Sequence, residues 1–241
     1  MLRDCAVVVV FHRVDDRYPD DAITLPVTRF TAMCRFFARR FEVISFGQLV
    51  TLLEQRSPLR GQLAITFDDG YRDNHHVAAP ILEQFGLPAC FFVTSGFIES
   101  SEVPWWDQRA GIASEWMSWD EVRDLKRRGF EIGAHTMTHA DLGRLSGEEA
   151  RREIVGSKLT LEACLGGPVD LFAYPFGREA QLTEANRALV VKAGFRCCPS
   201  AFGGLVRTGD DPFRFRRLPV TGWYRAPGEL GLEVLRASRA G

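Results

Sequence analysis

The sequence LAITFDDGY, at residues 63–71, places two adjacent carboxylates directly after a short apolar run. Residues 63–67 are apolar and include β-branched side chains, which predicts a buried strand that ends before Gly70. Asp68 and Asp69 would repel each other there, and an unpaired buried charge is costly. A metal ion held by one carboxylate, with the other left free as a base, accounts for the pair. A polar turn that opens the next helix is the alternative interpretation.

The bulk composition favours one α/β domain with a small or neutral partner. With 241 residues the chain has ample material for a core, and we expect a single domain over residues 1–241. Basic and acidic residues nearly cancel, 30 against 31, so the charge argues against a nucleic acid partner. None of the 6 cysteines forms a CxxC pair, which indicates reduced and mostly buried thiols.

The N-terminus carries a predicted strand rather than a targeting signal. Its apolar run at residues 5–11 is too short to span a bilayer, lacks a small-residue cleavage pattern and ends in His12 and Arg13. We therefore expect no transmembrane segment and a cytoplasmic protein, with a peripheral association with the membrane left open.

Strand-like and helix-like segments alternate along the chain. Strands are predicted at residues 7–11, 42–44, 63–67, 89–93, 130–134 and 171–174, with weaker candidates at 195–198 and 216–220. Helices are predicted at residues 28–40, 45–53, 73–85, 118–128, 146–165, 183–193 and 229–236, with a long tryptophan-rich loop at 94–117. Successive βα units predict a parallel sheet or a closed barrel, in which active groups gather at the C-terminal ends of the strands.

Polar residues follow several of these predicted strands. His12, the Asp68 and Asp69 pair, and the HxxxH pair of His135 and His139 all lie just past a strand end. The chain has only 5 histidines, so two in one HxxxH segment are informative. One carboxylate and two imidazoles form an Asp/His/His set, which leaves open positions for water and substrate as a catalytic zinc site does. Solvated loop histidines are the alternative.

Three motifs in the chain resemble those of a known enzyme family. TFDDG at 66–70, HTMTH at 135–139 and AYPFG at 173–177, in this order, resemble the polysaccharide deacetylases of the NodB-homology type, carbohydrate esterase family 4. The resemblance covers nearly the whole chain. It implies a distorted (β/α) barrel of about seven parallel strands and metal-dependent hydrolysis of N-acetyl groups on amino sugars.

The resemblance also implies roles for individual residues. Asp68 matches the catalytic base, and Asp69, His135 and His139 match the ligands of a divalent metal, with Zn²⁺ favoured over Co²⁺, Ni²⁺ or Mn²⁺. Asp68 would accept a proton from a metal-activated water as that water attacks the acetyl carbonyl. The oxyanion would then lie against the metal and a backbone N–H, for which Phe176 is the candidate because Pro175 has none.

Two positions depart from the pattern of the family. Many members carry an acid histidine near the C-terminus, but no histidine follows His139. A subgroup similar to the biofilm exopolysaccharide deacetylases has Tyr-His at the end of its first strand, and Phe11-His12 holds that place here, which makes His12 the candidate acid. A histidine satisfied structurally at a strand end is the alternative. Ala173 stands where many members hold the arginine that orients the base, so another group must orient Asp68.

Aromatic residues provide candidate contacts to a sugar, because aromatic faces pack on the apolar faces of pyranose rings. The candidates are Tyr174, Trp105, Trp106 and Trp223. Core packing is the alternative for the tryptophans. The arginines at 214, 216 and 217 could meet an anionic substrate, but an edge strand facing solvent is the safer expectation.

The function expected from the sequence is deacetylation of an N-acetylated glycan or sugar precursor. One alternative is a deformylase or deacetylase of a lipid-linked sugar, and another is a metal-independent amidohydrolase similar to allantoinase-like members of the fold. A carbohydrate-binding relic without activity is the non-enzyme alternative. The exact glycan, the native metal and the oligomeric state stay open at this level.

Overall fold

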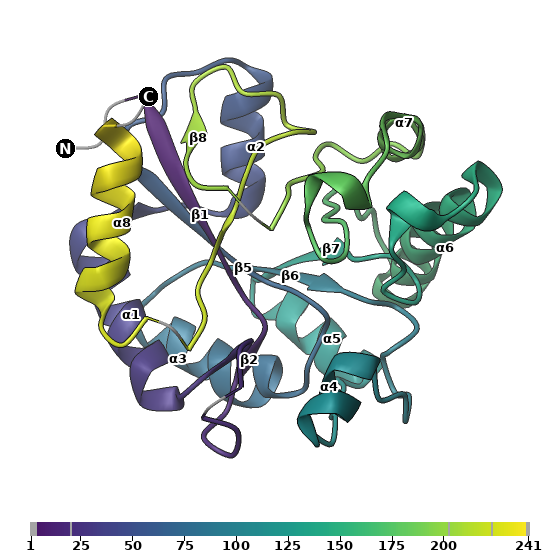
Figure 1. Cartoon of the computed structure of the whole chain (residues 1–241), viewed down its shortest axis with the longest axis horizontal. Coiled ribbons are helices and arrows are strands. Elements are labelled where there is room, and N and C mark those ends of the chain that lie inside the picture. The colour runs from purple at the N-terminus through teal and green to yellow at the C-terminus, as the bar shows by residue number, and fades with distance from the viewer. Residues whose placement is uncertain (1–3, 20, 202, 223, 240–241) are drawn as a thin grey trace.

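The computed structural model describes residues 4–19, 21–201, 203–222 and 224–239. The chain has an α/β architecture in which a mostly parallel sheet lies at the centre and helices surround it (Figure 1). The 7-stranded sheet consists of β1 Cys5–Phe11, β4 Glu42–Val43, β5 Gln62–Phe67, β6 Cys90–Val93, β7 Glu131–Ala134, β8 Val206–Arg207 and β9 Leu218–Pro219. A separate two-stranded sheet pairs β2 Arg13–Val14 with β3 Thr24–Leu25.

The register of the central strands places their C-terminal ends at one edge. Strands β1 and β5 pair in parallel, with Phe11 opposite Phe67 at the last position. Strand β5 pairs with β6, and β6 pairs with β7 so that Val93 lies opposite Ala134. The residues that follow β1, β5 and β7 therefore emerge together, and these residues include the polar motifs of the sequence.

The helices cover the sheet and begin largely where the sequence predicts. They are α1 Val27–Arg40, α2 Phe46–Glu54, α3 Ala79–Gln84, α4 Trp105–Ala110, α5 Trp119–Arg127, α6 Gly147–Leu165, α7 Glu184–Lys192 and α8 Pro227–Arg239. Short turns of other helix types lie at Asn74–Ala78, Leu142–Arg144 and Glu179–Gln181. Ser118 and Ser146 open α5 and α6 as full capping boxes, which confirms both predicted starts.

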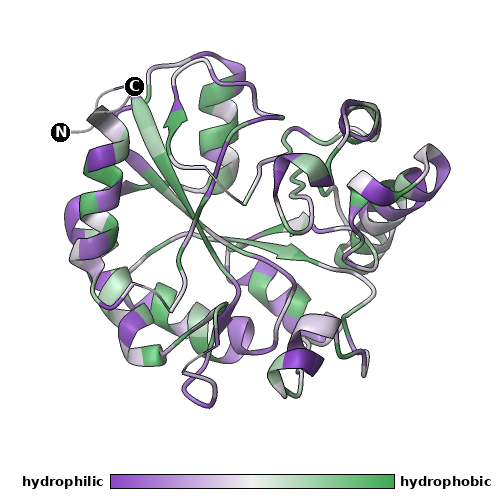
Figure 2. Cartoon of the chain, in the orientation of Figure 1, coloured by the Kyte–Doolittle hydropathy of each residue, from purple (hydrophilic) through white to green (hydrophobic). Residues whose placement is uncertain are grey.

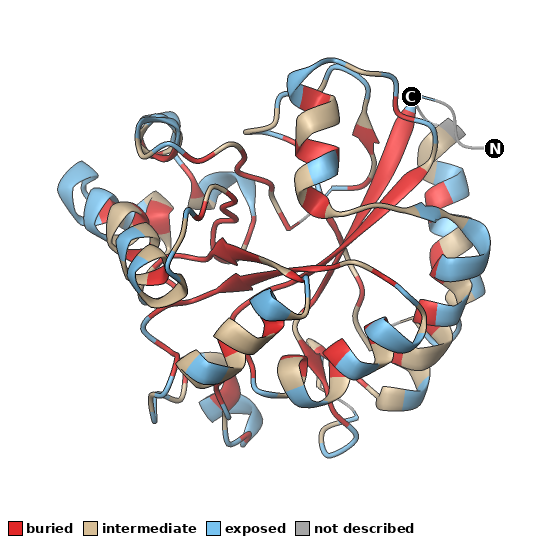
Figure 3. Ribbon diagram, turned by 180° about the vertical axis from the view of Figure 1, so that it is seen from behind, coloured by how far each residue is buried: buried red, intermediate tan, exposed pale blue. Residues whose placement is uncertain are grey.

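The core lies on both faces of the sheet. Strands β1 and β5 are buried along their whole length. Alternate residues of β1 enter opposite hydrophobic clusters, with Val9 in one and Val8 in the other. Burial on both faces is why these strands read as continuous apolar runs rather than alternating ones. The strands are accordingly hydrophobic in Figure 2 and buried in Figure 3, while the helices turn polar, exposed faces outward.

Four predicted elements differ from the structure. Residues 171–174 form no regular strand, because only Phe172 bridges to Ala134 before Pro175 and a turn at Phe176 redirect the chain. Residues 195–198 are not a strand either, and the 216–220 strand shrinks to β9. Residues 94–117, expected as a loop, contain α4.

The strand ladder stays open in the part of the chain that the structure describes. Its printed order runs from β7 through β6, β5 and β1 to β8, with β4 and β9 beside it. The irregular segments 171–174 and 195–198 lie in sequence between the two ends of this order. Among the described residues, no helix combines the length and the apolar character that crossing a bilayer requires.

Candidate active site

Three residues predicted as metal ligands meet at the edge formed by the strand ends. Asp69 follows β5, and the loop after β7 carries His135 and His139. The Oδ1 atom of Asp69 lies 3.5 Å from Nε2 of His135 and 3.2 Å from Nε2 of His139. The potential ligand atoms of the three side chains all lie within 4.8 Å of one another, so they can share one ion. All three are buried, with at most 9 % of any of them exposed.

The chemistry of these three side chains fits a divalent cation. Oδ1 of Asp69 is buried and accepts no properly oriented hydrogen bond from any described residue. Nδ1 of His135 donates to the carbonyl of Ala173 at 2.8 Å, so its Nε2 lone pair points toward Asp69, which is the usual arrangement for a ligating histidine. Burial lowers the pKa of His135 to about 4, so the ring is neutral at pH 7. One carboxylate and two neutral imidazoles form a donor set that suits zinc.

Backbone strain is concentrated at this site. Asp69, Thr136, His139 and Phe176 all have positive φ, at 77°, 64°, 57° and 61°. Each such non-glycine residue costs about 1–3 kcal/mol and persists only where its surroundings hold it. The four residues belong to the three motifs that the sequence singled out, so the strain coincides with the candidate site.

Asp68 is paired with a buried arginine, and its Oδ2 atom also lies 3.9 Å from Nε2 of His135. Arg217 is 0 % exposed, and its two terminal nitrogens donate to the two oxygens of Asp68, each at 2.7 Å. Arg217 also donates to Oγ1 of Thr66 and to the carbonyl of Ser200. Burial alone would raise the pKa of Asp68, but the charge and hydrogen bonds of Arg217, together with the nearby His135 and His12, outweigh burial and lower this pKa below the usual value. Asp68 is therefore an oriented carboxylate at neutral pH.

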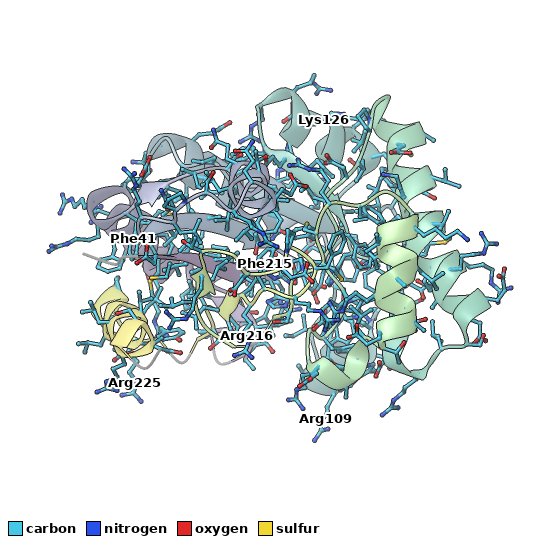
Figure 4. All side chains as sticks on the ribbon, turned by 90° about the horizontal axis from the view of Figure 1, so that it is seen from above. Phe41, Arg109, Lys126, Phe215, Arg216 and Arg225 are labelled. Atoms are coloured by element: carbon cyan, nitrogen blue, oxygen red, sulfur yellow. The ribbon has the colours of Figure 1, made fainter. Side chains whose placement is uncertain are left out.

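The expectation that the arginines at 214–217 face solvent is wrong for Arg217. Phe215 is buried, Arg216 is exposed and Arg217 is buried again, and Figure 4 labels Phe215 and Arg216 on this segment. In an extended segment adjacent side chains point to opposite sides, so one of two neighbouring arginines must face inward. That pattern was the signal for a buried cation, and Arg217 fills the orienting role that Ala173 cannot.

His12 lies at the same rim, directly after β1. Its backbone carbonyl accepts a hydrogen bond from Nδ2 of Asn74 at 2.8 Å, which fixes the strand end. Strands β1 and β5 end side by side, and the N–H of Asp68 donates to the carbonyl of Phe11 at 2.9 Å, so His12 and Asp68 leave the sheet at adjacent strand ends. Within the described part of the chain the ring forms no hydrogen bond, which leaves it available to a substrate.

Aromatic side chains from α4 and the 176 turn border the histidines. The ring of Trp106 lies 4.6 Å from that of His139, and the ring of Phe176 lies 4.7 Å from it. Trp105 packs edge-on against Trp106 and is 61 % exposed. These three rings form an aromatic wall, which we define as Trp105, Trp106 and Phe176.

A buried polar network that the sequence did not reveal holds this wall. Asp107 accepts hydrogen bonds from Arg13 at 2.6 Å and from the hydroxyl of Tyr71 at 3.0 Å. The same Tyr71 oxygen accepts from Nε1 of Trp106 at 2.9 Å, so the indole is fixed from below. Burial raises the pKa of Tyr71 well above its usual value, which keeps the hydroxyl protonated and able to donate.

Two predicted substrate contacts have other outcomes. Tyr174 is only 3 % exposed, and its hydroxyl donates to the carbonyl of Gly177 at 3.0 Å. This position supports the turn at Phe176 from beneath and does not present Tyr174 to a substrate. Trp223 lies outside the described residues.

The N–H of Phe176 donates to no described residue, so it is free to meet an oxyanion.

A second histidine cluster belongs to helix packing. His76 pairs with Glu121 at 2.6 Å and His75 pairs with Asp124 at 2.9 Å, which ties the turn at Asn74–Ala78 to α5. Glu121 also accepts from Arg72 at 3.0 Å. Because an arginine already shares the carboxylate, this cluster is less suited to a cation than the one at Asp69.

The comparison with protein families agrees with the motifs. The family model described as polysaccharide deacetylase matches residues 55–198, more than half of the chain. Among curated proteins, YxkH of Bacillus subtilis (strain 168), whose name assigns it to the same family, is 25% identical over 170 residues. That match covers 70% of this chain and 55% of YxkH, so the chain spans about half the length of this relative.

Solved structures share the fold over nearly the whole chain. The Streptococcus pyogenes deacetylase PplD, determined in complex with acetate, superposes with a TM-score of 0.80 at 18% identity, covering 95% of this chain and 98% of PplD. IcaB from Ammonifex degensii superposes with a TM-score of 0.78 at 21% identity, covering 96% and 97%. These matches bear out the predicted fold class, although the described strand ladder does not close.

Proposed function

Because this chain belongs to the polysaccharide deacetylase family, we propose that it hydrolyses N-acetyl groups on the amino sugars of a polysaccharide or glycan precursor. The observation that carries the proposal is the different environment of two adjacent carboxylates. Oδ1 of Asp69 lies 3.5 Å or less from Nε2 of both His135 and His139, with no hydrogen-bond partner of its own among the described residues. Both oxygens of Asp68 are instead bonded to Arg217, and its Oδ2 is 3.9 Å from Nε2 of His135. Such a pair provides one metal ligand and one separate base.

Asp69, His135 and His139 are the residues that would hold the metal. A divalent ion bound there supplies a Lewis acid for amide hydrolysis. The unpartnered Oδ1 of Asp69 and the neutral ring of His135 support this assignment. Zinc fits the O, N, N donor set best, and cobalt, nickel or manganese are the alternatives.

Asp68 is proposed as the general base. Arg217 keeps the carboxylate ionised and fixes its plane, so it is ready to accept the proton of an attacking water. The water oxygen then bonds to the acetyl carbon, and the N–H of Phe176 donates to the developing oxyanion. A positioned base contributes about 10²- to 10⁴-fold to the rate.

His12 is proposed as the general acid. Its place beside Asp68 and Asp69 allows it to protonate the amine as the carbon–nitrogen bond breaks, which releases acetate and the free amino sugar. The aromatic wall of Trp105, Trp106 and Phe176 would pack on the sugar ring. The acetate in the PplD structure is the product that such a reaction releases, which supports an acetyl substrate.

Acetate release is the direct test of this proposal. The purified chain is incubated with a panel of N-acetylated oligosaccharides, and the released acetate and free amines are both measured. The assay is run on the untreated protein, after removal of metal by a chelator, and after Zn²⁺ is added back. We expect equal amounts of both products, loss on chelation and recovery with metal. Activity that is indifferent to chelation would contradict the metal assignment, and formate release from N-formylated sugars alone would favour the deformylase alternative.

A further inference from the structure

The loop that carries both candidate histidine ligands is strained and therefore needs support. This loop, residues 135–139, has left-handed backbone at Thr136 and His139, which a β-branched threonine rarely adopts. The two histidines are also held differently. Nδ1 of His135 is bonded to Ala173, whereas Nδ1 of His139 is buried and bonds to no described residue. The orientation of His139 therefore depends on the backbone of the loop and on its packing.

One carboxylate on α6 binds the middle of this loop. Glu153 accepts the backbone N–H of Met137 and that of Thr138, both at 2.9 Å, with Oε2. Its Oε1 accepts the hydroxyl of Thr138 at 2.8 Å. Hydrogen bonds to a charged acceptor are stronger than neutral ones. A single side chain of α6, 15 and 16 positions later in the chain, thus holds the N–H groups of the two residues that precede His139.

The opposite side of the loop is held by the segment after β6. The N–H of Gly96 donates to the carbonyl of Met137 at 2.7 Å, and a Cβ at Gly96 would lie 2.5 Å from that oxygen. On α6, a Cβ at Gly156 would lie 2.2 Å from the sulfur of Met137. Gly96 and Gly156 therefore allow the loop to pack closely against both the segment after β6 and α6. Of the three residues that hold the loop, Gly96, Gly156 and Glu153, only Glu153 is charged.

We propose that Glu153 is a positioning residue that sets the metal affinity of the site by holding His139 in the ligating orientation. The inference rests on the proposed function, because it takes Asp69, His135 and His139 as the ligands. Glu153 acts through the N–H groups of Met137 and Thr138 and is not one of the three candidate ligands. The Ala173 carbonyl orients the His135 ring by a direct hydrogen bond, whereas Glu153 orients His139 indirectly, through the backbone of the loop.

The test compares the zinc affinity of variants on α6 by competition with a chromophoric chelator. Glu153→Ala removes all three bonds, and we expect the dissociation constant to rise about 10- to 100-fold, as for other groups that orient ligands. Glu153→Gln keeps an oxygen for the two N–H groups and an amide that donates to Thr138, so affinity should return to within about threefold of wild type. Glu148→Ala is the matched control, because Glu148 lies on α6 and, among the described residues, forms its ion pair with exposed Arg151.

The outcomes separate this inference from the proposed function. Two results would support positioning: zinc affinity near that of wild type in Glu153→Gln, and a cobalt absorption spectrum that changes only in Glu153→Ala. A general loss of stability would not change the geometry of the bound cobalt and so would not change its spectrum. Unchanged zinc affinity in Glu153→Ala, or equal loss in the alanine and glutamine variants, would overturn it while leaving the site intact. Zinc binding that survives His135→Ala would instead overturn the metal site. If Glu153→Ala does not fold, Thr138→Val at the exposed Thr138 deletes one bond, and an unchanged affinity there would count against the inference.

Discussion

Replacing Arg217 by methionine would leave the carboxyl group of Asp68 buried without its cation. In the native protein two bonds of 2.7 Å join these groups, and both side chains are almost fully buried. Removing one partner of a buried ion pair costs about 3–5 kcal/mol, because the other charge stays desolvated. The variant can relieve this cost only by protonating Asp68. Documented buried carboxyls reach pKa values of about 8–9, which would leave roughly 1–10 % of the base ionised at pH 7.

The pH dependence of stability should therefore reverse between the two proteins. In the native protein the pKa of Asp68 is lowered, so its contribution to stability is present above the unfolded pKa and is lost as pH falls through the folded pKa. In Arg217→Met burial raises this pKa, so the contribution is present below the unfolded pKa and is lost as pH rises through the folded one. Between pH 5 and pH 8, denaturant unfolding should show a constant contribution from Asp68 in the native protein, since both values lie above its lowered pKa, and a contribution that falls with rising pH in Arg217→Met.

Activity gives the second readout for this variant. The acid limb of the kcat/KM profile should move to higher pH, with about a 10- to 100-fold loss at pH 7 that shrinks as pH rises. Arg216→Met is the matched control, because Arg216 is the exposed neighbour and should leave rate and profile unchanged. A wild-type profile in Arg217→Met would refute the idea that Arg217 orients and ionises the base.

Three further predictions address the other groups of the site. Asp68→Asn should keep zinc but lose on the order of a thousandfold in kcat, and near wild-type turnover would remove Asp68 as the base. His12→Ala should bind zinc normally and lose about 10²- to 10⁴-fold in kcat, whereas loss of the ion measured by elemental analysis would make His12 a ligand. Trp105→Ala should raise KM about two- to tenfold on oligosaccharides with little change in kcat, and an unchanged KM would place Trp105 outside the sugar site.

The sequence predicts best those features that depend on local pattern. The strand at 63–67 and the capping boxes at Ser118 and Ser146 follow from a few neighbouring residues, and the structure contains them. The grouping of the three candidate metal ligands could be predicted because motifs placed after parallel strands emerge at one edge of the sheet. Motifs that are far apart in the sequence are thus brought together because each follows the C-terminal end of a strand in the same sheet.

Features that depend on distant partners could not be predicted in the same way. Arg217 reaches Asp68 across 149 positions, and Arg13 reaches Asp107 across 94. No residue near either arginine in the sequence indicates which carboxylate the arginine will pair with. Residues 195–198 have a strand-like composition, but the N–H of Cys198 bonds to the carbonyl of Pro212 in a loop, so no ladder forms. In all three cases the hydrogen-bond partner is determined by tertiary packing and not by neighbouring residues in the sequence.

The charge balance of the aspartate pair links the fold to the proposed chemistry. Asp68 and Asp69 are adjacent and both almost fully buried, so each needs positive charge nearby. Arg217 is committed to both oxygens of Asp68 and has no direct bond to Asp69. His135, which faces Asp69, is neutral at pH 7 and cannot balance it. Oδ1 of Asp69 lies 3.5 Å from Nε2 of His135 and 3.2 Å from Nε2 of His139, where a bound cation would supply positive charge. In the proposed mechanism Asp68 stays unligated, because both of its oxygens are bonded to Arg217, and it is then free to act as the base.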